Sequence, residues 1–244
     1  MKAYGITHQG KVRKENQDSF RFESPAGREI MTAVLCDGMG GAQAGGLAGT
    51  LAADTFMSHA ANSVDESSTA ADLRSIAGEA VDYANKKVYG KSFADITCMG
   101  MGSTLVALLV CGKRAVVANV GDSRAYLIQR GSIRQITTDH SLVEDMISRG
   151  KITREEARSH PQKNIITRAV GVEASVQCDL FDLKLTPGCR ILLCSDGLTN
   201  LLSDKEILEV LKANKEPEAA CTILLERALE RGAPDNVTVF LAQR

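Results

Sequence analysis

The sequence has few of the features that mark a nucleic-acid-binding or membrane protein. It contains no Trp, four Tyr and six Phe, so a base-stacking surface is not expected. Its 29 Lys and Arg are balanced by 30 Asp and Glu, which leaves a net charge of −1 and no basic excess for a polyanion. The longest apolar run, 105–111, is far shorter than the ~20 residues of a membrane helix, and the polar N-terminus lacks a signal-peptide core. We therefore predict a cytoplasmic protein with no nucleic-acid and no membrane partner.

The Cys and His patterns of zinc sites and disulfide frameworks are also missing. The seven Cys include no CxxC pair, and the four His form no HxxxH pair, so reduced, buried thiols are expected. One spacing, Cys221 followed after five residues by Arg227, occurs in thiol-dependent phosphatases. That chemistry needs a loop whose N–H groups bind phosphate. The interval here contains no Gly and has helical periodicity, which argues against it.

The 244 residues, 44% of them hydrophobic, are enough for a large core without disulfide support. Short runs rich in Val, Ile and Leu predict strands, and several runs are joined by turn signals at Cys111-Gly-Lys, Gly121-Asp and Arg130-Gly-Ser. These spacings predict antiparallel hairpins rather than βαβ crossovers. The predicted strands are 3–8, 30–36, 104–111, 114–120, 124–128, 133–136, 190–194 and 236–242.

Helices are predicted before, between and after these strands. Apolar residues recur with a 3.6-residue period between 70 and 90, and the polar segment 60–70 is expected to be a loop between two helices. Capping boxes at Ser203–Glu206 and Thr153–Glu156 predict helices over 204–213 and 154–159, and Pro217 begins a helix over 217–231. The mixture predicts an α+β fold in which helices cover antiparallel sheets.

Four Asp residues stand where strand-like runs begin or end. Asp37 follows MTAVLC, Asp122 follows VVANVG, Asp196 follows RILLCS, and Asp235 precedes NVTVFLA. Three of them have a neighbouring Gly, which lets the backbone approach a ligand closely. A single Asp-Gly pair is better explained as a turn, whereas four such places favour a shared site. Carboxylate oxygens without His or Cys suit Mg²⁺ or Mn²⁺.

Seven short motifs are spread along the chain. They are Arg13-Lys-Glu-Asn-Gln-Asp18, Asp37-Gly-Met-Gly-Gly41, Gly102-Ser-Thr104, Asn119-Val-Gly-Asp-Ser-Arg124, Asp139-His-Ser141, Ser195-Asp-Gly197 and Asp235-Asn236. In this order they resemble the motifs of metal-dependent Ser/Thr phosphatases of the protein phosphatase 2C (PPM) family, bacterial branch. The resemblance extends from about residue 4 to 242, and the ordered set is far more specific than any one motif.

The resemblance implies a four-layer α-β-β-α sandwich in which helices flank two central antiparallel sheets, with residues 1–244 as one catalytic domain. It also implies two Mn²⁺ or Mg²⁺ ions. Asp37 would bridge them, the Gly38 carbonyl would bind the first, and Asp196 and Asp235 would bind the second. Asp122, together with Asp196, would hold a third and weaker ion.

Other site residues follow from the same resemblance. Arg13 would bind the substrate phosphate, although its basic neighbours alone would suggest an ordinary solvated surface. Asp18 would hydrogen-bond metal-bound water. Met39 stands where eukaryotic members have a His proposed as general acid, so another group must protonate the leaving group, and a metal-bound water is the natural candidate. Gln17 replaces an acid of those members and is expected to order water instead.

The polar segment 139–168 corresponds to a flap beside the active site in the family. Arg149 and His160 are candidates for substrate contact there, and a solvated loop with short helices is an equal alternative for each of them. The resemblance implies hydrolysis of phosphoserine and phosphothreonine in proteins by a hydroxide that bridges the two metal ions. The expected partners are phosphorylated proteins, including a bacterial Ser/Thr kinase and its substrates, and the expected state is a monomer.

Two alternatives stay open. The protein could be a narrow switch phosphatase that acts on one regulatory phosphoprotein. It could also be a non-catalytic phosphoprotein-binding module. Loss of Asp37, Asp196 or Asp235 would have favoured that alternative, but all three are present.

Overall fold

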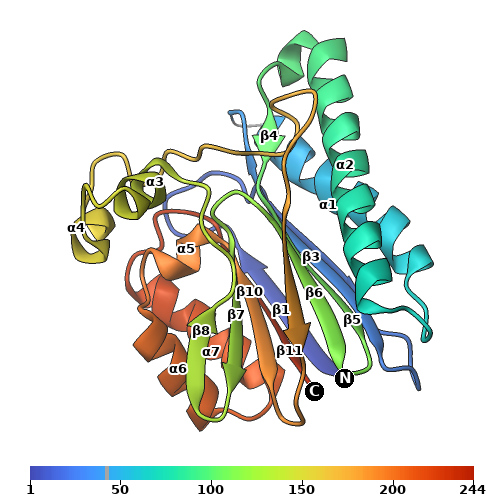
Figure 1. The fold of residues 1–244 in the computed structure, drawn as a ribbon. Helices are drawn as coiled ribbons and strands as arrows, with labels where there is room; N and C mark the ends of the chain where they lie inside the picture. Colours follow the sequence, from blue (N-terminus) through green and yellow to red (C-terminus); the bar gives the residue numbers. More distant parts are fainter. Residues whose placement is uncertain (42–43) are drawn as a thin grey trace.

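Two antiparallel sheets lie face to face in the computed structural model, which describes residues 1–41 and 44–244 (Figure 1). The first sheet has the order β1 (Lys2–His8), β11 (Val237–Gln243), β10 (Arg190–Cys194), β7 (Arg124–Gln129) and β8 (Ser132–Gln135). The second has the order β2 (Asp18–Glu23), β3 (Ile30–Met39), β5 (Leu105–Cys111), β6 (Arg114–Val120) and β9 (Asp179–Lys184), and β4 (Gly102–Ser103) pairs with β3.

Helices cover the outer face of each sheet. The long helices α1 (Ala44–Ser63) and α2 (Ala70–Ala94), followed by the short turn η1 (Ile96–Cys98), pack on the second sheet. On the first sheet lie α5 (Asp196–Thr199), α6 (Asp204–Ala213) and α7 (Pro217–Glu230). The small helices α3 (Leu142–Ser148) and α4 (Arg154–Arg158) project to one side (Figure 1). The predicted α-β-β-α sandwich is thus confirmed. Of the helices in the described part of the chain, none is both long and apolar enough to cross a membrane.

Three apolar layers hold these elements together. Leu35, Leu108 and Phe240 meet between the two sheets. Leu109, the neighbour of Leu108, faces the opposite side and packs in the layer under α1 and α2. Because successive side chains of a strand point to opposite faces, a strand buried on both sides must be apolar throughout, as β5 is. The third layer joins the first sheet to α5, α6 and α7 and includes Leu224.

Two of the three predicted hairpins are present, and one is wrong. Gly112, with φ +59°, connects β5 to β6, and Arg130 and Gly131, both with positive φ, connect β7 to β8. The Gly121-Asp122 segment makes no hairpin, because β6 and β7 belong to different sheets. The chain instead crosses from one sheet to the other at this point. Hydrogen bonds between His140 and the Gly121 N–H and carbonyl hold the crossing in place.

The predicted helices are confirmed with small changes at their ends. Both capping boxes form, Pro217 opens α7, and the loop between α1 and α2 is shortened to 64–69. Helix α2 extends four residues beyond the predicted end at 90. Strands β2 and β9 and helix α3 were not predicted, since each mixes charged and apolar residues without a clear period. The two-residue strand β4 and the four-residue helix α5 were also not predicted, since each is too short to show a period.

Candidate metal and phosphate site

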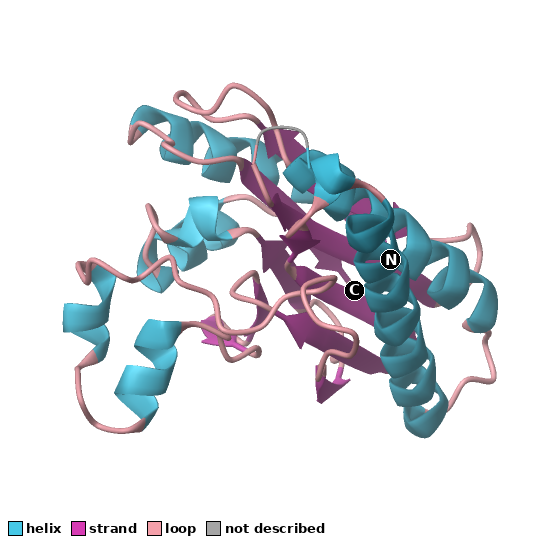
Figure 2. Cartoon of the chain, turned by 90° about the horizontal axis from the view of Figure 1, so that it is seen from above, coloured by secondary structure: helices cyan, strands magenta, loops and turns pink. Residues whose placement is uncertain are grey.

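The predicted acidic residues line one cavity. The view from above shows loops that cross over the strand ends (Figure 2). A cavity of about 470 Å³ at this end is lined by Asp37, Asp122, Asp196 and Asp235 together with Arg13. Gly38 lines the same cavity. Residues separated by up to 222 positions in the sequence therefore share one site.

The pairing of β2 with β3 places Asp18 directly opposite Asp37. The sequence predicted that Asp37 comes directly after its strand. In the structure Asp37 lies within β3. The reason is that Gly38 and Met39 continue the ladder by pairing with β4. The side chain of Thr104 accepts the Asp37 N–H at 2.9 Å, so the backbone that carries this carboxylate is held on both sides.

Asp18 is buried and is held by two hydroxyl groups, and it lies opposite Asp37 without being among the residues that line the cavity. Ser195 Oγ and Thr238 Oγ1 donate to Asp18 Oδ2 at 2.8 and 2.6 Å. Within the described residues, Asp18 Oδ1 is buried and has no hydrogen-bond partner. Burial raises the pKa of Asp18 to about 7, against the opposing effect of the two hydroxyl donors.

Asp196 is the first residue of α5, immediately after β10. Its Oδ2 accepts a hydrogen bond from Asn200 Nδ2 at 2.9 Å, whereas its Oδ1 is buried without a partner in the described part of the chain. Burial, followed by the charge of Asp235, raises the pKa of Asp196 to about 6. Gly197 is required next to it, since a Cβ there would lie 2.0 Å from the Asn236 carbonyl oxygen.

Asp235 and Arg13 form an ion pair at the rim, with 2.8 Å between Oδ2 and the guanidinium. The buried amide of Asn236 fixes the loop that carries Arg13, because its Nδ2 donates to the carbonyl oxygens of Gln9 and Glu15. The phosphate-binding candidate and the metal-ligand candidate are thus positioned by one Asn side chain.

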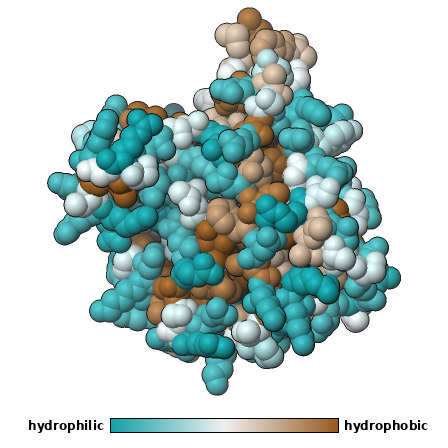
Figure 3. Space-filling model, viewed as in Figure 1, coloured by the Kyte–Doolittle hydropathy of each residue, from teal (hydrophilic) through white to brown (hydrophobic). Residues whose placement is uncertain are grey.

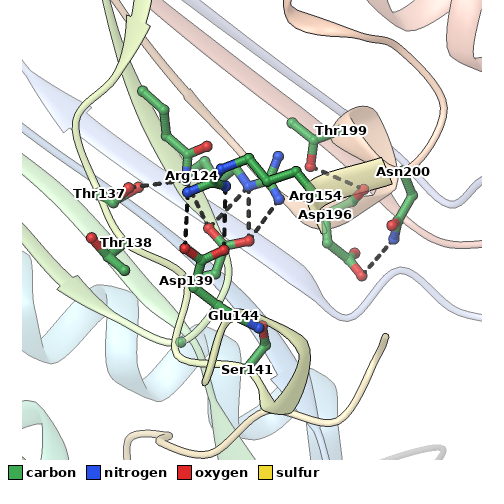
Figure 4. A network of polar contacts seen from close by, with 12 residues as sticks. Arg124, Thr137, Thr138, Asp139, Ser141, Glu144, Arg154, Asp196, Thr199 and Asn200 are labelled. Carbon is green, nitrogen blue, oxygen red and sulfur yellow. Dashed lines mark hydrogen bonds and ion pairs between the residues drawn. The ribbon is translucent and has the colours of Figure 1, made fainter. Parts of the chain in front are cut away.

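Asp122 lies in the segment that crosses between the sheets. Burial, followed by the charges of Asp196 and Asp139, raises the pKa of Asp122 to about 8. Arg124, two residues later, donates from Nε and NH2 to the Asp139 carboxylate at 2.6 to 3.0 Å (Figure 4). Since Asp139 begins the flap, this charged pair joins the flap to the Asp122 segment.

Gly38 lies too close to its neighbours for any other residue. A Cβ at this position would lie 1.9 Å from the Gly45 carbonyl oxygen and 2.9 Å from that of Gln17. A residue with a side chain would push α1 and the Gln17 loop away from β3. Position 38 can therefore line the cavity in this backbone arrangement only as Gly.

The donor set fits a hard divalent cation. The pKa of Asp37 is raised well above its usual value by burial and then by the charges of Asp18 and Asp196, so negative charge is concentrated here without enough positive partners. The two buried oxygens without partners, on Asp18 and Asp196, are acceptors of the type that such ions or their waters satisfy. Within residues 1–41 and 44–244, no three His, Cys, Asp or Glu side chains already have the arrangement of a closed ligand shell. If Asp235 binds an ion, its carboxylate must share or leave the ion pair with Arg13.

The flap contributes different residues from those predicted. Arg149 and His160 do not line the cavity, whereas Asn164 and Ile166 do. Arg154 and Arg158 line a second cavity of about 320 Å³ between the flap and the start of α6. Thr104 and Asn236 also line the main cavity, and the sequence signal for them was their place inside the quoted motifs.

Cys221 is confirmed as a helical, buried residue. It lies within α7, and burial raises the pKa of its thiol to about 12. A thiol of this pKa is protonated near neutral pH and is not a nucleophile.

Comparisons with known proteins agree with this geometry. The model of a family described as "Protein phosphatase 2C" matches residues 7–231. The chain is 37% identical over 239 residues to the serine/threonine phosphatase stp of Listeria monocytogenes, covering 98% of this chain and 94% of that protein. It is 39% identical over 233 residues to the serine/threonine protein phosphatase PstP of Mycobacterium tuberculosis, covering 96% of this chain but 43% of PstP.

Solved structures give the same result. The structure of the Mycobacterium tuberculosis phosphatase PstP/Ppp aligns with a TM-score of 0.89 at 37% identity, covering 99% of this chain and 97% of that one. Stp1 from Staphylococcus aureus aligns with a TM-score of 0.91 at 36% identity, covering 99% and 94%. A PstP catalytic domain in complex with two manganese ions aligns with a TM-score of 0.85 at 35% identity, covering 99% and 97%.

Proposed function

The chain belongs to the protein phosphatase 2C family and is a metal-dependent serine/threonine protein phosphatase, and we propose the residues that carry its reaction. Residues 1–244 form one catalytic domain, with a flap over 139–168. The observation that carries the assignment is the convergence of four carboxylates and Arg13 on one cavity, with two buried carboxylate oxygens left without partners in the described residues.

Asp37, Gly38, Asp196 and Asp235 would hold the two central ions, Mn²⁺ or Mg²⁺, in this proposal. Asp37 would serve both ions, the Gly38 carbonyl the first, and Asp196 and Asp235 the second. Asp122 and Asp196 would hold a third, weaker ion. When bound, the ions supply positive charge that stabilises the phosphoryl group and lowers the pKa of water near it.

Arg13 binds the non-bridging oxygens of the substrate phosphate, because its planar guanidinium matches two of them at once. Its present partner, Asp235, lies at the rim of the same cavity, so a small rotation moves the guanidinium from carboxylate to phosphate. Asp18, fixed by Ser195 and Thr238, presents its second oxygen as an acceptor that orients water for attack.

We propose water as the source of the proton for the departing Ser or Thr oxygen. Met39 stands at the position of the His of eukaryotic members, and of the described residues that line the main cavity none is His. Gln17 donates to the Gly41 carbonyl oxygen at 2.8 Å and lines the same cavity, which agrees with a role in ordering water rather than in proton transfer.

The substrates are phosphoproteins, and we propose that they include a Ser/Thr kinase and the proteins it phosphorylates. A monomer in the cytoplasm is the state proposed for the enzyme. The alternative of a switch phosphatase for a single regulatory phosphoprotein uses the same site and differs only in substrate range. Rates on a panel of phosphoproteins distinguish the two: one outstanding rate supports the switch, and comparable rates support the general enzyme.

The test of the proposed chemistry is hydrolysis of a phosphothreonine peptide with added Mn²⁺ or Mg²⁺, with chelator, and after alkylation of thiols. We expect activity with metal, loss with chelator, and survival of alkylation, because Cys221 is buried in a helix. Activity in excess chelator that alkylation removes would overturn the metal mechanism.

A further inference from the structure

A further cavity adjoins the catalytic one and is lined by other residues than the cavity beside α6. Its volume is about 330 Å³, and it shares two lining residues, Met39 and Ile166, with the catalytic cavity. Its other apolar lining comes from Ala169, Val172 and Val176. We call it the Met39–Val172 pocket. The shared residues make it an extension of the site where the phosphate is bound.

The pocket is shaped by side chains that converge on Gly102. A Cβ at Gly102 would lie 2.8 Å from Met39 Cε and 2.7 Å from Val172 Cγ2, so these two apolar ends meet over a position that has no side chain. Val172 is 49% exposed and Ile165, beside Ile166, is 45% exposed. Apolar residues gather on the visible face of the molecule, from the tip above the sheets downward (Figure 3). Exposed apolar surface next to an active site indicates a binding site for an apolar group. Binding such a group is favourable because it removes this surface from water.

The charged residues of the pocket are Arg168 and Glu173. Arg168 Nη1 already donates to Asp179 Oδ1 at 2.8 Å and to the Gln177 carbonyl oxygen at 3.1 Å. Glu173 is exposed and has no ion pair among the residues the structure describes. Its carboxylate repels an acidic or phosphorylated group and so disfavours such a neighbour of the phosphorylated residue.

We propose that the Met39–Val172 pocket binds an apolar side chain of the phosphoprotein substrate, of about the size of Leu, Ile or Met, close in sequence to the phosphorylated residue. The inference deepens the proposed function and depends on it. A volume of about 330 Å³ is at the small end of the ~300–1,000 Å³ typical of ligand pockets, which suits one side chain rather than a cofactor. An extended peptide advances ~3.3–3.6 Å per residue, so a neighbouring cavity is reached within a few residues.

The experiment uses phosphothreonine peptides in which Leu or Ser occupies each position up to three residues from the phosphothreonine. For the wild-type protein with Mn²⁺, we expect Leu at one or two positions to raise kcat/KM about tenfold over Ser, mainly by lowering KM. Val172→Asp is expected to bring the ratio of kcat/KM for the Leu peptide to kcat/KM for the Ser peptide close to one. Val172→Phe, which fills the pocket, is expected to move the preference from Leu to Ala.

Ile96→Asp is the matched control, since Ile96 is 84% exposed and outside the pocket, and it should keep the wild-type ratio. An equal rate for Leu and Ser peptides at every position, or a Leu preference that survives Val172→Asp, would overturn the pocket assignment. Hydrolysis of an aryl phosphate, which has no flanking residues, is measured in parallel. If the wild-type protein with metal hydrolyses neither the aryl phosphate nor any peptide, the proposed function fails as well.

Discussion

The side-chain hydroxyls of Thr104 and Ser123 lie 2.8 Å apart in the core of the active-site end, and they connect the two segments that carry Asp37 and Asp122. Thr104 Oγ1 accepts the Asp37 N–H, and its own hydrogen can then be donated to Ser123. Both hydroxyl groups are buried. A shift of one carboxylate segment is therefore transmitted directly to the other.

Replacement of Thr104 by Val should reveal this connection. Val keeps the shape but leaves the Asp37 N–H and the Ser123 hydroxyl without a partner, so the free energy of unfolding should fall by about 1–3 kcal/mol. Thr104→Ser keeps the hydroxyl group and should recover most of the loss. Denaturant unfolding of both variants, together with kcat on a phosphopeptide, provides the measurement. Equal stability of the Val and wild-type proteins would show that the hydroxyl pair contributes nothing.

Asp37→Asn tests the bridging carboxylate. Asn keeps the size of Asp37 but removes the charge proposed to hold two cations, so both ions should bind more weakly and turnover should be almost abolished. In chelator at pH 8 the variant should be at least as stable as the wild type, because it removes one member of a repelling carboxylate cluster. Calorimetric titration with Mn²⁺ and thermal unfolding check both statements. Wild-type turnover at saturating metal would show that the Asp37 carboxylate is not needed to hold the ions.

The parts of the fold that the sequence predicted are those with strong local signals. Strand β5 is apolar throughout, and the helix starts at Thr153, Ser203 and Pro217 depend on residues within one turn. The crossing at Gly121 was mistaken for a hairpin, since a positive-φ Gly is equally suited to a turn and to a change of sheet. Only the contact with His140, nineteen positions away, decides between them.

The site was predictable as a set of residue types but not as a set of contacts. The acidic residues could be chosen from the local sequence. Asp37, Asp122 and Asp196 each stand beside a Gly at the end of an apolar run, and Asp235 precedes an apolar run. The partners of Asp18 could not be chosen in this way, because Ser195 and Thr238 lie 177 and 220 positions away and meet it only through the sheet registers. The same applies to Asn236, whose amide fixes the loop before Gln17.

The raised pKa values predict a decrease of stability with increasing pH in the absence of metal. The folded-state pKa values are about 7 for Asp18, about 8 for Asp122 and about 6 for Asp196, against about 3.9 for Asp in an unfolded chain. Between pH 4 and these values the folded state binds more protons, so stability is present at low pH and is lost as pH rises. Each such group changes the free energy of unfolding by about 1.4 kcal/mol per pH unit.

Thermal unfolding in chelator between pH 5 and pH 8 tests this prediction, with Asp18→Asn as the variant that removes one titrating group and flattens the slope. Residues with lowered pKa, such as Asp95 at about 2, titrate below this range and do not interfere. Added Mn²⁺ should reduce or reverse the decrease, since a cation favours the ionised carboxylates. A midpoint that rises with pH in chelator would contradict the raised pKa values.

The last prediction concerns Asp122, which we assign to a weaker third ion rather than to the central pair. Two carboxylates, Asp122 and Asp196, supply few protein ligands, so water must complete the coordination of a hard cation and its affinity should be low. Asp122→Ala should therefore leave two ions bound per molecule in calorimetric titration. Hydrolysis of a phosphopeptide should slow by about 10²-fold, because an alkoxide leaving group depends on proton delivery in the transition state. Hydrolysis of an aryl phosphate, whose leaving group hardly needs that proton, should slow much less. Loss of the tightly bound pair, or equal slowing on both substrates, would place Asp122 in the central site instead.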